Sequence, residues 1–173
     1  MTDRREAWLR GPIAGVSAML QPVAHALVQA EEETRALLVE FDDRHLWMQP
    51  AGAASVGFHL QHLSGVIDRL TTYARGKPLN ADQLEALSRE GTGDPGTSSA
   101  ALTAAFTSRV DDTLRWLATV DPSTLADARG VGRGQLPSTV IGLLVHAAEH
   151  TTRHLGQLIV TVRVVRTLPV RDA

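Results

Sequence analysis

Apolar residues recur at steps of three and four along most of the chain, which is the spacing of one face of an α-helix. The pattern predicts four long helices, over residues 21–41, 55–75, 99–120 and 138–167. A shorter helix is predicted over residues 81–90, because Asn80 can cap it and the run that follows favours helix. Strands and helices do not alternate. The chain is therefore predicted to be all-α, a four-helix bundle with short accessory helices.

Turn-forming residues separate these helices. Gly-Lys-Pro at residues 76–78 predicts the end of the second helix. Residues 91–99, GTGDPGTSS, are the most loop-like stretch; we expect a plain connection, with a cover over a site as the alternative. Residues 121–137 predict an irregular segment with room for a brief extended piece. Because no repeat or linker interrupts the chain, residues 1–173 are predicted to form a single domain.

The composition supports packed helices. Hydrophobic residues make up 43% of the 173 residues, but aromatic residues only 4%, whereas sheets favour aromatic and β-branched residues. The chain is long enough to bury a sizeable core. It contains no cysteine, which excludes a disulfide, a thiolate ligand and a cysteine nucleophile. Any thiol chemistry would therefore need a thiol from outside the chain.

The charge distribution argues against nucleic acid as a partner. The net charge is −2, and arginine is interspersed with Asp and Glu, whereas nucleic-acid-binding proteins carry a basic patch. The first residues, MTDRREAWLRG, lack the apolar core of a signal peptide. No apolar run approaches the ~20 residues of a membrane span. We expect a cytoplasmic protein that binds neither nucleic acid nor a membrane.

Five of the seven histidines fall in two short helical stretches. His146, His150 and His154 are four residues apart, a step that drifts only about 40° around a helix, so they share one side. His59 and His62 are a helical turn apart in FHLQHL. Neutral imidazole is the commonest protein ligand for zinc, and catalytic zinc sites usually have three protein ligands and one open position. The two stretches are predicted to face each other across the bundle and hold one divalent metal.

Spacing alone does not choose the ligands. His146 and His154 span about 12 Å of helix axis, so one ion cannot easily take both. His150 belongs to either pair, and His59 and His62 are both candidates on the other helix. The alternative is that the histidines are structural. A catalytic histidine without a metal is disfavoured, because no nucleophile motif such as G-x-S-x-G accompanies it.

The residues around the histidines resemble a known family. HLQHLSGVIDRL, followed about ninety residues later by HAAEHTTRHLGQL, is similar to the DinB/YfiT-like metalloenzymes, and the end motif H-x-x-x-H-x-G-Q is the most specific part. The resemblance covers nearly the whole chain. It implies an up-down-down-up four-helix bundle with the metal at one end. It also implies a frequent dimer, so we expect a homodimer.

Carried over residue by residue, the family's ligand in the second long helix corresponds to His62, and its pair in the last helix to His150 and His154. The additional histidines, His59 and His146, can support a ligand through a hydrogen bond or serve as alternative ligands. The expected cofactor is a divalent ion, zinc or nickel.

The resemblance also implies a chemistry. Family members include transferases that use bacillithiol, mycothiol or glutathione, and a mycothiol-dependent maleylpyruvate isomerase. This favours a transferase that activates a low-molecular-weight thiol toward a small-molecule substrate. A hydrolase using metal-bound water and a non-enzymatic metal-binding or ligand-binding stress-response module are the alternatives.

Three further residues are candidates near the predicted site. Glu149 can orient a ligand or move a proton. Gln157, seven residues after His150, has nearly the same angular position and can hydrogen-bond a ligand. Arg69, seven after His62, is a candidate to bind an anionic substrate group, although a surface ion pair with an Asp or Glu is the favoured interpretation. No residue is assigned a catalytic role from the sequence.

Overall fold

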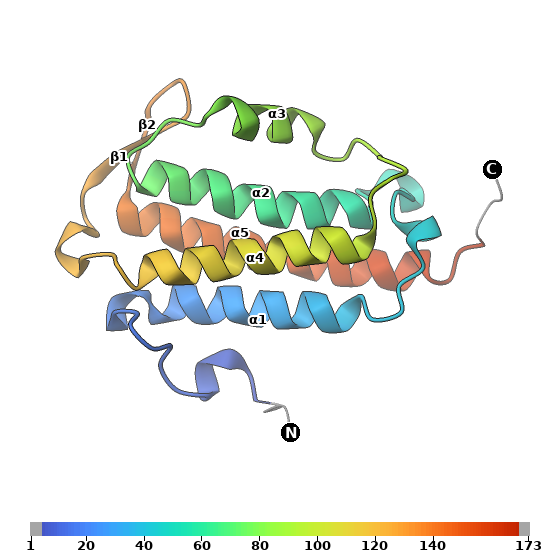
Figure 1. Cartoon of the computed structure of the whole chain (residues 1–173), viewed down its shortest axis with the longest axis horizontal. Helices are drawn as coiled ribbons and strands as arrows, with labels where there is room; N and C mark the ends of the chain where they lie inside the picture. The colour runs from blue at the N-terminus through green and yellow to red at the C-terminus, as the bar shows by residue number, and fades with distance from the viewer. Residues whose placement is uncertain (1–4, 170–173) are drawn as a thin grey trace.

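Four long helices pack along one another, with a short fifth helix on their outside (Figure 1). The computed structural model describes residues 5–169, so the predicted domain limits at 1 and 173 lie outside the described residues. The elements are α1 (Gln21–Leu37), α2 (Val56–Ala74), the short α3 (Ala81–Arg89), α4 (Ser99–Leu117) and α5 (Val140–Val165). In Figure 1, α1 and α5 run in one direction and α2 and α4 in the other. The predicted all-α bundle is confirmed, with the up-down-down-up order that the resemblance implied.

Side-chain caps begin three of the helices where the sequence predicts them. The Ser55 hydroxyl accepts a hydrogen bond from the backbone N–H of Phe58 at 3.1 Å. Asn80 and Gln83 form a reciprocal capping box at the start of α3. The Thr139 hydroxyl accepts from the N–H of Gly142 at 3.1 Å, at the start of α5. These contacts satisfy backbone donors that the first helical turn leaves unpaired.

All five helices are somewhat shorter than predicted, and α1 and α4 lose the most residues at one end. α1 ends at Leu37 rather than 41, because the chain turns at Glu40, whose φ of 54° is left-handed. Leu38 and Phe41 still pack against the core. α4 likewise ends at Leu117 rather than 120. Apolar spacing continues past both helix ends because the residues that follow remain in contact with the core.

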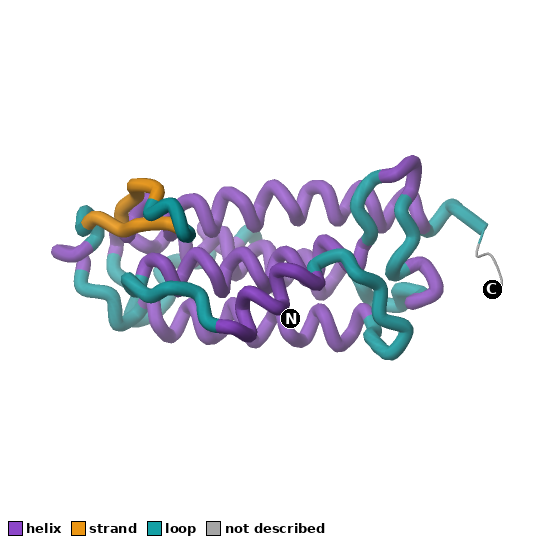
Figure 2. Tube along the Cα trace, turned by 90° about the horizontal axis from the view of Figure 1, so that it is seen from above, coloured by secondary structure: helices purple, strands orange, loops and turns teal. Residues whose placement is uncertain are grey.

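A β-hairpin occupies part of the segment predicted to be irregular. Strands β1 (Ala128–Val131) and β2 (Leu136–Thr139) pair antiparallel, with Ala128 opposite Thr139 and Val131 opposite Leu136. The strands lie at one end of the bundle (Figure 2). The brief extended piece that the sequence allowed is therefore a pair of strands.

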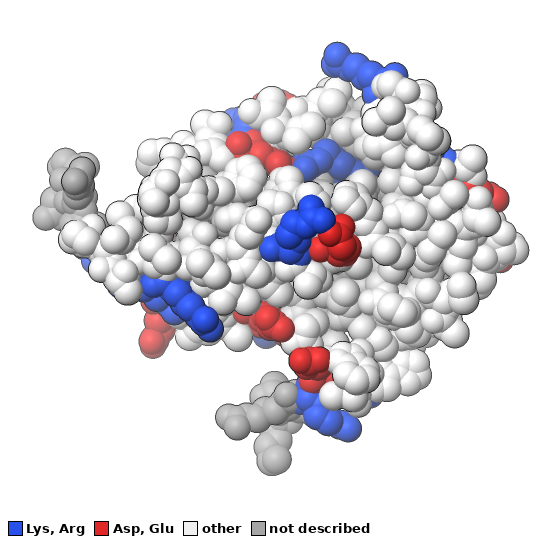
Figure 3. All heavy atoms as spheres, turned by 180° about the vertical axis from the view of Figure 1, so that it is seen from behind, with Lys and Arg blue, Asp and Glu red and all other residues white. Residues whose placement is uncertain are grey.

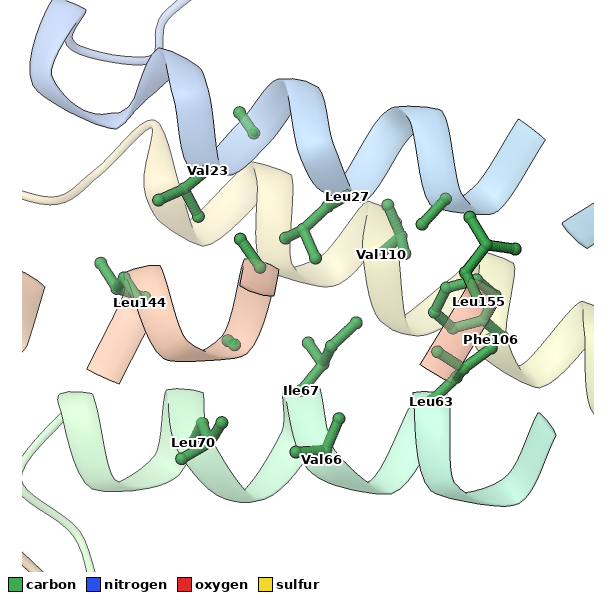
Figure 4. Packing of buried hydrophobic residues seen from close by; sticks show 14 of the residues in the cluster. Val23, Leu27, Leu63, Val66, Ile67, Leu70, Phe106, Val110, Leu144 and Leu155 are labelled. Carbon is green, nitrogen blue, oxygen red and sulfur yellow. The ribbon is translucent and has the colours of Figure 1, made fainter. Parts of the chain in front are cut away.

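The core receives side chains from all four long helices (Figure 4). Leu27 from α1, Ile67 from α2 and Leu144 from α5 are fully buried, and Phe106 from α4 is the largest fully buried side chain. Burial of each such side chain stabilises the fold by about 1.5–3 kcal/mol. The core holds α2 and α5 side by side, and these two helices carry the clustered histidines.

Because α2 and α4 run in the same direction, the chain must return between them. α3 makes most of this return along the outside of α2 (Figure 1). Residues 90–98 therefore lie near the amino-terminal half of α2. The connection after α3 is thus placed beside the histidines of α2.

Opposite charges are interspersed on the surface. On the face in Figure 3, acidic and basic side chains are scattered and several lie next to each other. Within residues 5–169, no helix combines the length and apolar character needed to cross a membrane.

Candidate metal centre

The histidines of α2 and α5 meet where these two antiparallel helices pack together. His59 and His62 lie in the first two turns of α2, and His150 and His154 lie in the middle of α5. Both pairs lie on the sides of their helices that face the partner helix, as helical periodicity requires.

Three of the histidines form a compact cluster. Ligand-capable atoms of His62, His150 and His154 all lie within 4.8 Å of one another. The Nε2 atoms of His62 and His150 are 2.9 Å apart. The ring centroid of His154 is 4.3 Å from that of His62 and 4.7 Å from that of His150. These three residues could hold a metal ion.

The donor atoms lie close to the spacing that a divalent ion of the zinc type requires. Zinc–nitrogen bonds are about 2.0–2.1 Å, so two nitrogens on one ion are at most about 4.2 Å apart, and the His62–His150 pair meets this limit. The Nδ1 atom of His150 is buried and has no hydrogen-bond partner among the described residues.

The surroundings favour the neutral imidazole at His59, His150 and His154. Burial, with the neighbouring His62 adding to it, lowers the pKa of His154 to about 4. The same two causes lower the pKa of His59 to about 4. Burial followed by His62 also lowers the pKa of His150. Neutral imidazoles have a free lone pair, which is the form that binds a metal.

A carboxylate that sequence reasoning missed lies behind His62. Glu90 accepts hydrogen bonds from His62 Nδ1 at 2.7 Å and from Arg69 Nη1 at 2.5 Å. Burial would raise the pKa of Glu90, but the hydrogen bonds from His62 and Arg69 outweigh it and lower that pKa. Glu90 is 28 residues from His62 in the chain, so no spacing pattern connects the two.

Arg69 lies in this arrangement rather than at an open surface. Its guanidinium is paired with Glu90, and its side chain is 12% exposed. The ion pair favoured for Arg69 from the sequence is therefore present, but it is largely buried rather than at the surface. A contact between Arg69 and substrate stays a prediction.

Comparison with known proteins places the chain in a family. The model of the DinB superfamily matches residues 26–158, which include all three clustered histidines and Glu90. The chain belongs to the DinB superfamily. No curated protein matches it. The family resemblance seen in the sequence is thereby confirmed.

The other histidines of this DinB-superfamily chain differ in their surroundings. His59 is buried, and its Nδ1 atom is 3.3 Å from Nδ1 of His154, so it can support that imidazole. His146 lies outside the cluster: its side chain is half exposed and its Nδ1 atom is 3.1 Å from a carboxylate oxygen of Glu149. Glu149 also pairs with Arg153. The predicted roles of His59, His146 and Glu149 in binding or proton transfer stay predictions.

A groove opens beside the cluster of this DinB-superfamily chain. It has a volume of about 570 Å³ and lies between the chain before α2 and the outer side of α5. Its lining is formed by Ala53, Ala54, His59, Arg153, Gly156, Gln157, Val160 and Thr161. Apolar methyl groups, a cation and an amide are thus combined in one groove that reaches the buried His59. Gln157, predicted to contact a ligand, lies in this groove.

Proposed function

We propose that the protein is a metal-dependent transferase that activates a low-molecular-weight thiol for attack on a small electrophilic substrate. The observation that carries the proposal is the meeting of three histidines, with ligand-capable atoms within 4.8 Å of one another, in a chain without cysteine. Such a chain can provide a metal site but no sulfur nucleophile. A thiol from outside would supply the nucleophile.

His62, His150 and His154 would hold the divalent ion, zinc or nickel. When bound, such an ion lowers the pKa of a coordinating thiol so far that the thiol becomes a thiolate. Glu90 and His59 would orient two of the three imidazoles through hydrogen bonds. The helices that carry the three imidazoles are fixed by the core, so the site is formed before a ligand arrives.

The groove beside the cluster would hold the remainder of the thiol. Arg153, which is paired with Glu149, can pair with a ligand carboxylate instead, and Gln157 can hydrogen-bond an amide. The side chains of Ala53, Ala54 and Val160 can pack against methylene groups. In the reaction, the thiol loses its proton to solvent and its sulfur forms a bond to an electrophilic carbon. The leaving group departs with the electrons of the broken bond and takes up a proton.

The test combines metal analysis with a thiol screen. Purified protein is assayed with glutathione, bacillithiol or mycothiol and a chromogenic electrophile such as 1-chloro-2,4-dinitrobenzene, before and after chelation. We expect a rate above the uncatalysed reaction that needs both the thiol and the metal. A rate unaffected by chelation would overturn the proposal. Turnover of an ester or amide substrate without thiol would instead identify a hydrolase, and stoichiometric metal without any activity would identify a binding module.

A further inference from the structure

The carboxylate of Glu90 joins two residues of α2 that are seven positions apart. It accepts from His62 Nδ1 with one oxygen and from Arg69 Nη1 with the other. The three side chains are 16%, 9% and 12% exposed for His62, Glu90 and Arg69, so water has little access to the arrangement. Hydrogen bonds to an ionised, poorly solvated partner are the strong ones.

This arrangement determines which nitrogen of His62 carries the proton. An ionised carboxylate can only accept hydrogen bonds, so His62 must donate from Nδ1. In a neutral imidazole the other nitrogen, Nε2, then keeps its lone pair, and it is this atom that lies 2.9 Å from Nε2 of His150. We propose that Glu90 is a positioning residue which, held by Arg69, fixes His62 in the tautomer and orientation that present Nε2 to a metal ion. The inference rests on the metal-binding part of the proposed function.

Gly65 leaves the space that the ion pair needs. It lies on α2 between His62 and Arg69, and a Cβ atom there would come within 2.4 Å of Glu90 Oε1 and 2.6 Å of Arg69 Nη1. Both distances are far below van der Waals contact. Any larger residue at position 65 would therefore displace the carboxylate of Glu90, the guanidinium of Arg69 or both, and disturb their pairing. One side of helix α2 thus carries the ligand candidate His62, Gly65, which leaves the space, and Arg69.

The connection after α3 is anchored so that Glu90 stays in place. The N–H of Gly91 donates to the side chain of Gln61 at 2.8 Å, and Gly91 adopts a left-handed φ of 83°. Gly91 also packs against the ring of Phe58, which stacks on His62 with centroids 5.3 Å apart. The strap, residues 90–94, therefore contacts α2 beside the Glu90–His62 hydrogen bond.

Trp47 holds the far end of the strap. Its indole lies between Gly57 of α2 and Gly93 of the strap, and its Nε1–H donates to the carbonyl of Asp94 at 3.3 Å. The stretch predicted to be a plain connection, residues 91–99, thus contacts α2 and Trp47 closely, directly after Glu90. Removing Glu90 should weaken the metal site without touching any of the three histidines.

The test uses Glu90→Gln, which keeps the side-chain shape. An amide can either accept from or donate to an imidazole nitrogen, so it no longer selects one tautomer of His62. We expect zinc affinity, measured by competition with a chromophoric chelator, to fall about 10-fold to 100-fold. In the chelated protein, ¹⁵N NMR should show His62 changing from the form protonated at Nδ1 to a mixture of tautomers. Glu85→Gln, an exposed acid on α3 paired with Arg89, is the matched control and should change neither quantity.

Gly65→Ala is the second variant, in case Glu90→Gln unfolds. It displaces the carboxylate while leaving every titratable group in place, and alanine suits a helix better than glycine. It should give the same loss of affinity and the same NMR change. Wild-type zinc affinity and an unchanged His62 tautomer in a folded variant would overturn the inference. Failure of the wild type itself to bind zinc would instead overturn the metal site of the proposed function.

Discussion

Nε2 of His62 and Nε2 of His150 lie 2.9 Å apart although 88 residues separate them in the chain. One atom belongs to α2 and the other to α5, and the antiparallel packing of these helices brings them together. Two neutral imidazoles can share one hydrogen at this distance, or they can share one ion. A shared ion could also bind His154, whose ring lies next to the rings of His62 and His150.

Replacing His62, His150 or His154 by alanine is therefore expected to remove the metal. Loss of an outer hydrogen-bonding partner alone costs about 10-fold to 100-fold in metal affinity, so loss of a ligand should cost more than about 100-fold. Elemental analysis of the purified proteins measures the stoichiometry, and circular dichroism checks that the variants are folded. His146→Ala is the matched control, because its imidazole is half exposed and lies against Glu149. Full retention of metal by His62→Ala and His150→Ala would rule out the site.

Two glycine-to-alanine changes in helices should alter stability in opposite directions. At Gly57, a Cβ atom would lie 2.3 Å from Cζ3 of Trp47, so Gly57→Ala should lower the free energy of unfolding by about 1–3 kcal/mol through overpacking. At Gly156 of α5, nothing lies within 4 Å of the added atom. Gly156→Ala should raise the free energy of unfolding by about 0.5–1 kcal/mol, because alanine loses less backbone entropy in a helix. Urea unfolding measures both, and a stabilising Gly57→Ala would contradict the position of Trp47.

The chelated protein should lose stability as the pH falls from about 6.5 to about 4. The pKa values of His59 and His154 are lowered to about 4 in the folded protein, against 6.5 as the ordinary value. Between these pH values the unfolded chain binds protons that the folded chain does not, so unfolding is favoured. Above about 6.5 both states are neutral at these positions and the contribution is constant.

Unfolding of wild type and His59→Gln over this pH range isolates the histidine contribution. Carboxylates elsewhere titrate in both proteins and cancel in the comparison. The wild type should show the steeper loss of stability with falling pH. Equal slopes in the two proteins would show that burial does not lower the pKa of His59.

The helices could be predicted from the sequence because the apolar residues that face the core recur at steps of three and four. Leu63, Val66, Ile67 and Leu70 are all buried on the inner side of α2, as their spacing requires. The predicted helix ends were less accurate. Phe41 packs against the core although it lies beyond the last turn of α1, so the apolar pattern runs on past the end of the helix. The hairpin was missed because its strands are four residues long and contain glycine and proline, which weaken any strand pattern.

The site was predictable only where one helix carries two of its members. His150 and His154 lie on one side of a helix because of their spacing, and the family motif adds His62. The structure brings these three residues together. Glu90 follows the end of α3 and reaches His62 only because the chain returns along α2. Contacts made by a returning connection leave no period in the sequence. Gly65 and Gly91 leave room for the contact between Glu90 and α2, but the sequence alone does not show what a glycine leaves room for.

Filling the groove over Gly156 should weaken thiol binding without affecting the metal. Gly156 lines this groove together with Ala53, Gln157 and Val160, so a leucine there is expected to occupy part of the space proposed to hold the body of the thiol. For Gly156→Leu we expect unchanged zinc stoichiometry, little change in kcat and a KM for the thiol raised about tenfold, which corresponds to about 1.4 kcal/mol of lost binding. Val145→Leu, an exposed position on the same helix outside the groove, is the matched control. An unchanged KM in Gly156→Leu, measured by initial rates at varied thiol concentration, would show that the thiol binds elsewhere, because a side chain of that size cannot share the groove with it.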